Sequence, residues 1–252
     1  MLKINSVTKP LFAIFVAVFL IYDISTKNIF AKNSEPISKK LWQEISAEEL
    51  ENLKKLYAAL ENRNFSEASN YAAKIKEIEQ KQNKKMLFSD AVGDLILWKK
   101  FSGKLDSKRT SFSDISRFTA DNPFYPNLEE MKRNVEQVAI ANDIPFQVAE
   151  PYFKAIPAES KESKIYLTQS KIEYLSSAKL SENDRDEARR DVQKSIAEIW
   201  IDENFSKQEE ESFLAKYEGQ LTSDNHFSRA ENLLWRGKNE EAKRIFHLLD
   251  DD

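Results

Sequence analysis

The sequence of 252 residues contains no cysteine, and this absence excludes several kinds of chemistry. Disulfide bonds, thiolate metal sites, a cysteine nucleophile and a lipid anchor on cysteine all need a thiol. Histidine occurs only as His226 and His247, which leaves little for metal coordination. We therefore expect neither a metal nor a cofactor.

Glycine and proline are also scarce, with four and seven copies. Both residues disfavour the interior of a helix, whereas the long runs rich in Glu, Lys, Leu and Ala favour it. No stretch alternates apolar and polar residues in the manner of a strand. With 32% charged and 41% hydrophobic residues, the composition is that of an ordinary folded domain. The predicted fold class is all-α.

The first 31 residues have the pattern of an export signal. Lys3 and Lys9 precede an uninterrupted apolar run, Leu11 to Tyr22, and a polar stretch then leads to Ala31. A bilayer-spanning helix needs about 20 apolar residues, so this run is too short to span comfortably. We expect residues 1–31 to be a cleaved signal peptide and the mature chain to lie in the periplasm. An uncleaved membrane anchor is the alternative.

Charge also bears on the kind of partner. The whole chain carries a net charge of −4, and removing residues 1–31 takes away three Lys and one Asp. A mature chain of still more negative charge argues against a nucleic-acid partner.

One spacing of residues, which we call the hairpin frame, recurs along the mature chain. Leu234 precedes Ala242 by eight residues across the turn 236–239, and Leu60 with Ala68 and Leu180 with Ala188 repeat that spacing. Each Ala follows a Glu, and the residues five places before the three Ala are Arg63, Asn183 and Gly237. Gly237 would end a helix in the left-handed conformation, which Asn183 also tolerates. The frame predicts divergent helical hairpins, which need neighbours to bury their apolar stripes.

Capping residues and apolar spacing predict the individual helices. Ser46 with Glu49 and Ser206 with Glu209 form capping boxes, and Ser66 and Ser113 are expected as further N-caps. The prolines at 145, 151 and 157 should divide residues 143–158 into short or kinked helices. Apolar faces at helical spacing occur in 50–60, 68–78, 87–101, 112–118, 128–138, 164–178, 188–200 and 213–217, with two more helices in 221–249.

No residue of this sequence is assigned a catalytic, cofactor-binding or metal-binding role. Asp224 and His226 suggest a base with its orienting partner, but no nucleophile lies at a fixed place beside them, so packing or capping is preferred. His247 is expected at the surface. The acidic groups Glu129-Glu130 and Glu209-Glu210-Glu211 are expected in first helical turns, where they complement the helix dipole.

The tryptophans Trp42, Trp98, Trp200 and Trp235 allow two interpretations. An exposed indole could stack on a sugar ring. At helical spacing among Leu and Ile, these side chains are instead expected in the core, because large aromatic residues dominate packing.

Three segments, taken in order, resemble a known family. They are a tryptophan-containing helix at 95–101, a Phe-initiated helix at 112–115 with an Asn-Pro-x-x-Pro-Asn loop at 122–127, and a Leu-Thr hairpin at 221–226 continued by Arg229 and 233–237. In this order and spacing they resemble the N-terminal superhelical region of soluble lytic murein transglycosylases of the alphaproteobacterial type. In the third segment Asn225 stands between Asp224 and His226, where the family pattern has Asp-His. The resemblance covers residues 41–249.

The resemblance implies a fold for this chain and a separate domain for catalysis. The fold would be a U-shaped superhelical solenoid of helical, TPR-like hairpins, occupying residues 32–252. In this family a separate lysozyme-like domain cuts peptidoglycan with the glutamate of a Glu-Ser pair, followed by Gly-Leu-Met-Gln. Here Glu159-Ser160, Glu162-Ser163 and Glu211-Ser212 lack that context, and no glycine precedes Leu. The catalytic domain is therefore expected to be absent, and no cleavage is expected from this chain alone.

Three functions follow as hypotheses. The favoured one is a periplasmic, non-catalytic scaffold that positions substrate for a murein lytic enzyme, either a shortened remnant or half of a split enzyme. A TPR-like adaptor for a partner protein is the second, and an active glycan-cleaving enzyme the third. Expected partners are peptidoglycan or a separately encoded catalytic domain, with self-association through residues 227–249. Contact with a membrane is expected only through residues 1–31, and only if this segment is not cleaved.

Overall fold

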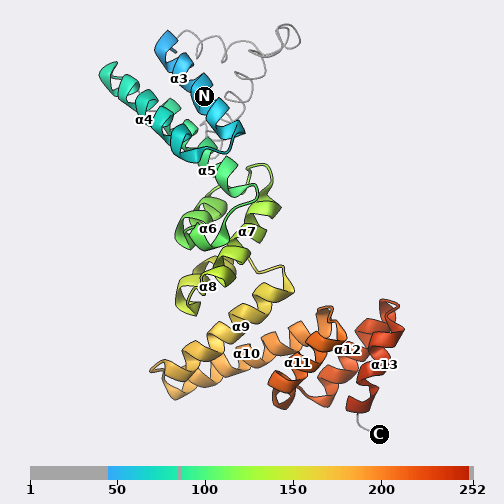
Figure 1. Cartoon of the computed structure of the whole chain (residues 1–252). Coiled ribbons are helices and arrows are strands. Elements are labelled where there is room, and N and C mark those ends of the chain that lie inside the picture. Colours follow the sequence, from blue (N-terminus) through green and yellow to red (C-terminus); the bar gives the residue numbers. More distant parts are fainter. Residues whose placement is uncertain (1–44, 85–86, 250–252) are drawn as a thin grey trace, which may run out of the picture. The chain divides into compact units, whose positions relative to one another are not determined.

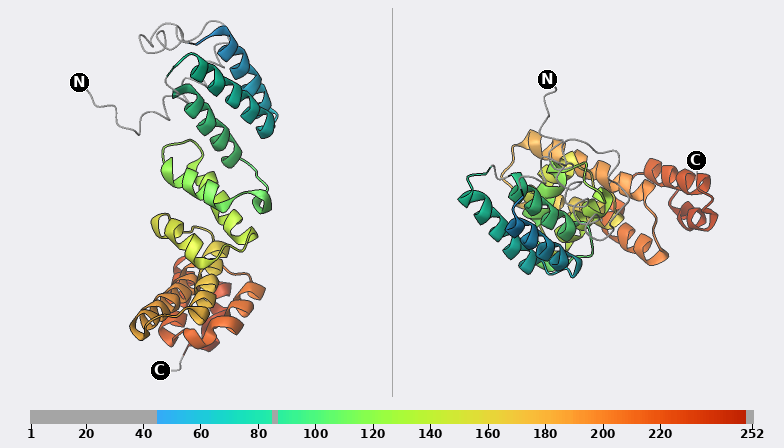
Figure 2. Two further views of the ribbon diagram at one scale, coloured as in Figure 1. Left: turned by 90° about the vertical axis from the view of Figure 1, so that its left-hand side faces the viewer. Right: turned by 90° about the horizontal axis from the view of Figure 1, so that it is seen from above.

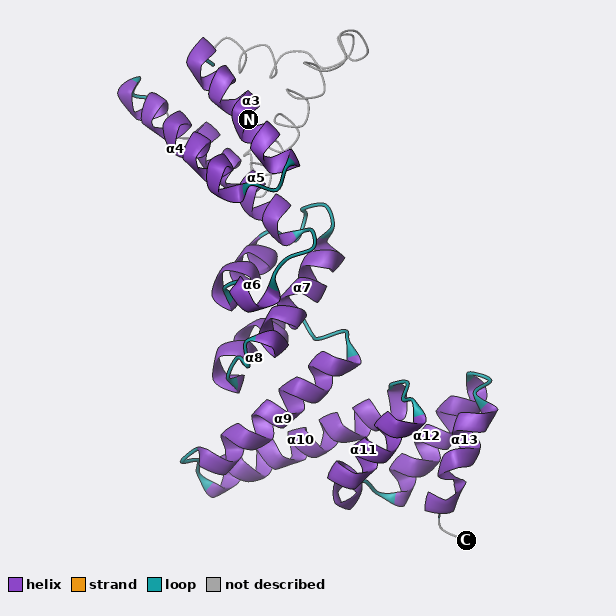
Figure 3. Cartoon of the chain, viewed as in Figure 1, coloured by secondary structure: helices purple, strands orange, loops and turns teal. Residues whose placement is uncertain are grey.

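The computed structural model describes residues 45–84 and 87–249, and over these residues the chain is helical, with no strand (Figure 3). The predicted all-α class is confirmed. The predicted signal peptide and Trp42 lie outside the described residues. None of the described helices is both long and apolar enough to cross a bilayer.

The chain divides into two compact units, each with its own buried apolar cluster. Of the described residues, the first unit comprises those up to Asp106 together with Ser113–Asn134, and the second comprises Ser107–Phe112 and those from Val135 to Leu249.

The first unit begins with three helices packed in succession (Figures 1 and 2): α3 (Ala47–Glu61), α4 (Phe65–Lys81) and α5 (Leu87–Phe101). Their inner faces meet in one cluster, which includes Leu53, Leu56 and Leu60 of α3, Ala68 and Ile75 of α4, and Val92, Leu95 and Ile96 of α5. These are positions three, four or seven apart, so the apolar periodicity of the sequence selects the buried face.

The start of α3 agrees with its prediction and the start of α4 does not. Ser46 and Glu49 exchange side-chain and backbone hydrogen bonds, as a capping box requires. At α4, however, the N-cap is Asn64, whose side chain accepts from the backbone N–H of Glu67. Ser66 was therefore predicted wrongly, because Asn64 is an equally good cap and lies closer to the turn.

The turn that ends α3 has the same geometry as the turn that ends α12 (Ser223–Trp235). Arg63 and Gly237 both have positive φ, at 55° and 70°. After each, the next N–H bonds back to the carbonyl five residues earlier, from Asn64 to Ala59 and from Lys238 to Leu233. Both are Schellman motifs, which satisfy the free carbonyls at the helix end. The hairpin frame is thus confirmed at these two places.

At the third place the frame fails. Helix α9 (Lys161–Ser177) already ends before Leu180, and α10 (Glu182–Asp202) begins behind an N-cap at Ser181. Asn183 therefore lies inside the first turn of α10 and is not a left-handed turn residue. The local capping signal, in which Ser181 accepts from the N–H of Asp184, overrides the frame.

The rest of the first unit brings together two of the segments singled out in the sequence. Helix α6 (Phe112–Asp121) is followed by the proline-containing loop and by α7 (Leu128–Ala141). The indole N–H of Trp98 donates to the carbonyl of Pro126 at 2.8 Å, which ties α5 to the loop. Tyr125 of the loop is buried with its ring edge-on to Phe118. Trp98 packs against the core and has the structural position predicted for it.

The second unit continues with α8 (Phe146–Ala155), α9, α10, α11 (Lys207–Tyr217), α12 and α13 (Asn239–Ile245), with short 3-10 turns at Ser107–Arg109, Glu218–Gln220 and Phe246–Leu248. Pro145 and Pro157 lie on either side of the short helix α8, as predicted, whereas Pro151 lies inside it. Helix α10 packs against α9 and α12, and α12 against α13. The predicted capping box at Ser206 and Glu209 starts α11.

Candidate functional site

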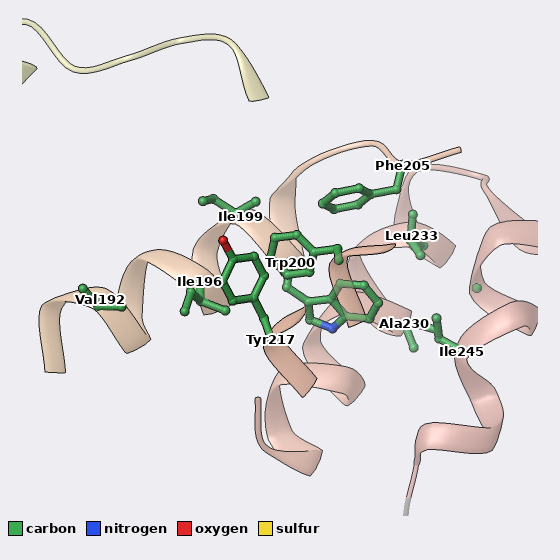
Figure 4. Close-up of a cluster of buried hydrophobic side chains, with 11 residues drawn as sticks. Val192, Ile196, Ile199, Trp200, Phe205, Tyr217, Ala230, Leu233 and Ile245 are labelled. Atoms are coloured by element: carbon green, nitrogen blue, oxygen red, sulfur yellow. The ribbon is translucent and has the colours of Figure 1, made fainter. Parts of the chain in front are cut away.

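An aromatic cluster holds α10, α11 and α12 together (Figure 4). Trp200 of α10 is fully buried at its centre. Its ring stacks on Phe213 with centroids 5.8 Å apart, and His226 of α12 lies edge-on at 5.7 Å. His226 is thus buried against an indole, where a packing role was expected, while Asp224 is exposed in the first turn of α12.

Arg229 is buried in the same cluster and is the residue that sequence periodicity missed. Its guanidinium lies 4.2 Å from the Trp200 ring centroid and donates to the carboxylate of Glu210 at 3.1 Å. It also donates to the carbonyls of Trp200 and, at 3.1 Å, Glu203. Burial lowers the pKa of Arg229, against the opposing effect of Glu210. Because a buried charge is tolerated only when paired and hydrogen-bonded, this pair fixes how α11 and α12 meet.

Glu210 was predicted merely to complement a helix dipole, and this interpretation is incomplete. Its carboxylate is buried and also accepts from Arg244 of α13 at 2.9 Å. The hydrogen bond to Glu210 raises the pKa of Arg244. One carboxylate therefore joins α11 to two cations nineteen and thirty-four residues away along the chain.

A second group of cations surrounds the short loop after α10. Arg236, at the end of α12, donates to the carbonyl of Asp202 at 3.1 Å and to Asn204 Oδ1 at 2.7 Å. Lys238 donates to the same Asn204 Oδ1, and Lys161 Nζ donates to the Asn204 carbonyl at 3.0 Å. The turn 236–238 thus presents two cations that meet on one neutral oxygen. We call Trp235, Arg236 and Lys238 the hairpin tip.

A groove of about 370 Å³ lies beside this loop, between α9 and α11. Its walls combine apolar and charged side chains, namely Lys161, Ile165, Phe205, Gln208, Glu209, Ser212, Phe213, Lys216 and Tyr217. Lys161 pairs with Glu209 at 2.6 Å, and the hydrogen bond from Lys161 lowers the pKa of Glu209 to about 2. The volume is at the small end of the range for ligand sites.

The terminal hairpin exposes more apolar surface than its sequence pattern predicts. Phe227, Leu234, Trp235 and Phe246 are all exposed, and Trp235 is 84% accessible. The prediction that Trp235 belongs to the core is wrong. The inward face of α12 consists instead of His226, Arg229, Ala230 and Leu233. Trp235 follows Leu233 by two residues, about 200° around the helix, and so points away from the core.

In the first unit, a half-buried carboxyl group lies close to a buried phenol. Burial, together with the charge of Asp90, raises the pKa of Asp94 on α5. Burial, and then the charge of Asp94, raises the pKa of Tyr125 above its usual range. The Tyr125 hydroxyl has no hydrogen-bond partner within the described part of the chain. No sequence signal marked this pair, because 31 residues separate its members and the loop at 122–127 brings them together.

The Glu-Ser pairs hold structural positions. Ser160 is the N-cap of α9, and the buried carboxylate of Glu136 accepts from its hydroxyl and from its backbone N–H at 3.1 Å. Ser163 is buried in the first turn of the same helix. In the third pair, Ser212 donates back to the Gln208 carbonyl of its own helix at 2.7 Å. Each serine therefore lies in a helix or at its N-cap.

Other predicted residues lie apart from one another. His247 is exposed in the last 3-10 turn, well along the chain from His226. Glu129 and Glu130 lie in the first turn of α7, as predicted, where they pair with Lys132 and Arg133. Among the described residues there is no group of three or more His, Asp or Glu that could hold a metal ion.

Two features of the second unit are open to a ligand or partner. One is the hairpin tip, and the other is the apolar stripe formed by the exposed side chains of Phe227 and Leu234 on α12, with Phe246 also exposed in the turn after α13. Comparison with protein-family models, with curated proteins and with solved structures finds no match to this chain.

Proposed function

We propose that this chain is the non-catalytic, substrate-positioning scaffold of a murein lytic transglycosylase in the periplasm. Its helical hairpins would continue as a TPR-like superhelical solenoid of the U-shaped kind. The part that cuts the glycan would be supplied separately, and the terminal hairpin would join the scaffold to it or to a second copy of the chain.

The observation that carries this proposal is the apolar stripe on α12 and the turn after α13. Phe227 and Leu234 are seven residues apart, within about 20° of each other around the helix, and both are exposed. Elsewhere on the same hairpin, the side chains of Leu233, Ala242 and Ile245 are buried in the cluster with α10 and α11. A solenoid hairpin buries one face against the preceding unit and offers the other to the next. An apolar face of this kind marks an interface.

Two further features support a hairpin scaffold. The α3–α4 and α12–α13 hairpins turn through the same Schellman geometry. The hydrogen bond from Trp98 to Pro126 joins two of the three segments on which the family resemblance rests. The capping and buried positions of Ser160 and Ser163 support a structural role for their Glu-Ser pairs.

Docking through the stripe can be tested with the double variant Phe227→Ser/Leu234→Ser. The wild type should associate with rising concentration in sedimentation velocity, or bind the separately encoded catalytic domain, and the double variant should do neither. Phe124→Ser, which removes an exposed aromatic residue of the first unit, is the matched control and should behave as the wild type. A strictly monomeric wild type that binds no such domain would remove the docking argument.

The murein role has its own test. The wild type should co-sediment with murein sacculi and release no anhydro-muropeptides from them. Measurable release would overturn the non-catalytic assignment. Failure to bind sacculi, with protein docking through the stripe retained, would favour the second candidate, a TPR-like adaptor, which the same exposed apolar face also suits.

Export is the remaining part of the proposal. Mass spectrometry of protein from the cell envelope should give a chain beginning near Lys32. An intact Met1 terminus in the membrane fraction would replace the cleaved signal by an anchor.

A further inference from the structure

We infer that the hairpin tip, formed by Trp235, Arg236 and Lys238, is a binding site for an acidic glycan, that is, for a sugar polymer whose units carry carboxylate groups on the ring or on an attached peptide. This inference rests on the proposed function, because it names the part of the chain that would contact the glycan and the chemistry by which it would do so.

The first element of the site is Trp235. Its side chain is 84% accessible, although burying an indole is among the more favourable steps in folding. An exposed indole offers a flat apolar face and one N–H donor. A sugar ring has the complementary surface, with an apolar C–H face and hydrogen-bonding hydroxyl groups around its edge.

The second element is the pair of cations that follow Trp235 in the sequence. Arg236 donates to Asp202 O at 3.1 Å, Asn232 Oδ1 at 3.2 Å and Asn204 Oδ1 at 2.7 Å. Lys238 donates to the same oxygen of Asn204. All of these acceptors are neutral, so they orient the two side chains without cancelling either charge. Because the two cations share one acceptor, their positive charges repel each other. A carboxylate placed beside them would be attracted by both.

Neighbouring carboxylates are already bound to other lysines. Glu203, in the same loop as Asn204, pairs with Lys164 at 2.5 Å. Glu209, at the rim of the groove, pairs with Lys161 at 2.6 Å. Neither of these two carboxylates is therefore an ion-pair partner of Arg236 or Lys238.

The size of the tip selects among anionic ligands. A stable protein interface buries about 800 Å² on each partner, which is far more than one indole and two cations supply. Membranes and nucleic acids call for a broad positive field, whereas this chain carries a net charge of −4. One aromatic face with two cations matches one or two sugar units, and the repeats of a polymer would raise the occupancy of such a small site.

Binding can be measured by co-sedimentation with murein sacculi and by titration with polygalacturonate, an acidic glycan unrelated to murein. Trp235→Ala and Arg236→Gln/Lys238→Gln should each weaken binding to both by about tenfold or more, a difference well resolved by titration. Raising the ionic strength from about 0.05 M to about 0.3 M should weaken the wild type and affect the charge variant much less. Chitin oligosaccharides, which are neutral, should bind more weakly than polygalacturonate.

Matched controls separate the tip from general effects. Phe124→Ala removes an aromatic residue that is 60% exposed in the first unit. Lys243→Gln removes an exposed lysine from the same hairpin, one that pairs with Glu240 at 2.8 Å. Both controls should bind as the wild type does, and they and Trp235→Ala should keep its thermal midpoint.

The outcomes distinguish this inference from the proposed function. Sacculus binding that survives Trp235→Ala and the charge variant would overturn the inference and leave the murein role intact. Binding to polygalacturonate but not to sacculi would support the tip as an acidic-glycan site and overturn the murein role. No binding to either glycan, or equal binding to vesicles of phosphatidylglycerol, would overturn the inference.

Discussion

Trp200 and Trp235 are the same residue type in neighbouring helices, and the structure gives them opposite surroundings. Trp200 is enclosed by Phe205, Phe213 and His226, whereas Trp235 is exposed at the end of α12. Trp200→Ala should therefore lower the free energy of unfolding by about 3–5 kcal/mol, through lost transfer energy and an unfilled cavity. Trp235→Ala should change it by less than about 0.5 kcal/mol. Urea denaturation of both variants measures these two changes. A large loss of stability in Trp235→Ala would show that this side chain belongs to the core.

Sequence periodicity could not make this distinction, because the inward face of α12 contains polar residues. Helical spacing groups Phe227, Ala230, Leu233 and Leu234 on one face, and this grouping assumes that only apolar residues turn inward. Arg229 is fully buried instead, because Glu210 supplies its counter-charge from nineteen residues earlier in the chain. A compensated buried charge leaves no mark in a local pattern, and it rotates the helix so that Phe227 and Leu234 face outward.

Glu209 provides a test of electrostatics at the residue scale. Its pKa is lowered from 4.5 to about 2 by hydrogen bonds from Lys161 and from Ser206. A carboxyl group with a depressed folded-state pKa contributes stability above its unfolded pKa and loses it as pH falls through the folded value. Stability should therefore decline between about pH 4.5 and pH 2, less steeply in Glu209→Gln and in Lys161→Gln. Urea midpoints measured across this range check the prediction, and an unchanged slope in both variants would contradict it.

At the scale of elements, Gly93 in helix α5 and Gly237 in the turn after α12 should respond in opposite ways to substitution by alanine. An added Cβ would meet nothing within 4 Å at either residue, so only the backbone differs. Gly237 has a φ of 70° in the turn after α12, where Ala should cost about 1 kcal/mol. Gly93 lies in the middle of α5, where Ala should add roughly 0.5–1 kcal/mol. Chemical denaturation of the two variants gives the sign of each change in the free energy of unfolding. A stabilising Gly237→Ala would contradict the left-handed turn.

Much at the element scale was predictable from local signals. The capping boxes at Ser46 and Ser206 and the turn at Gly237 lie where the sequence places them. The left-handed position after α3 is held by Arg63, which local propensity does not favour. Its guanidinium reaches the carbonyl of Lys104, a contact across 41 residues that no local pattern contains. The repeated spacing therefore predicts where this turn lies, but not the contact with Lys104 that accompanies it.

For the whole molecule, the sequence predicts the fold class but not the candidate site. The all-helical character follows from composition and periodicity, which are properties of short stretches. The hairpin tip depends on Asn204, whose side-chain oxygen gathers two cations from more than thirty residues away. Asp94 and Tyr125 likewise come together only through the fold of the first unit. Both arrangements join residues distant in sequence, so one sequence read alone could not reveal them.

The cations around the loop after α10 also have a consequence for how the folded chain resists proteases. Connections between helices are the usual sites of proteolytic nicking. The connection at 203–206 is held by Arg229, Arg236 and Lys161, which bond to its backbone or to the end of α10. At the connection 178–181, the ends are capped by their own helices, and a further side chain bonds to the backbone only weakly, from Arg185 to the Ala178 carbonyl at 3.4 Å. Its Lys179 is exposed.

Brief digestion with trypsin should therefore cut after Lys179 well before Lys207, although both lysines are exposed beside helix starts. Arg236→Gln should speed the cut at Lys207 without changing the cut at Lys179, as read from fragment masses over time. Earlier cleavage at Lys207 in the wild type would contradict a restrained loop. If the order holds, the cation Arg236, which is proposed to meet an acidic glycan, also protects the α10–α11 connection from cleavage.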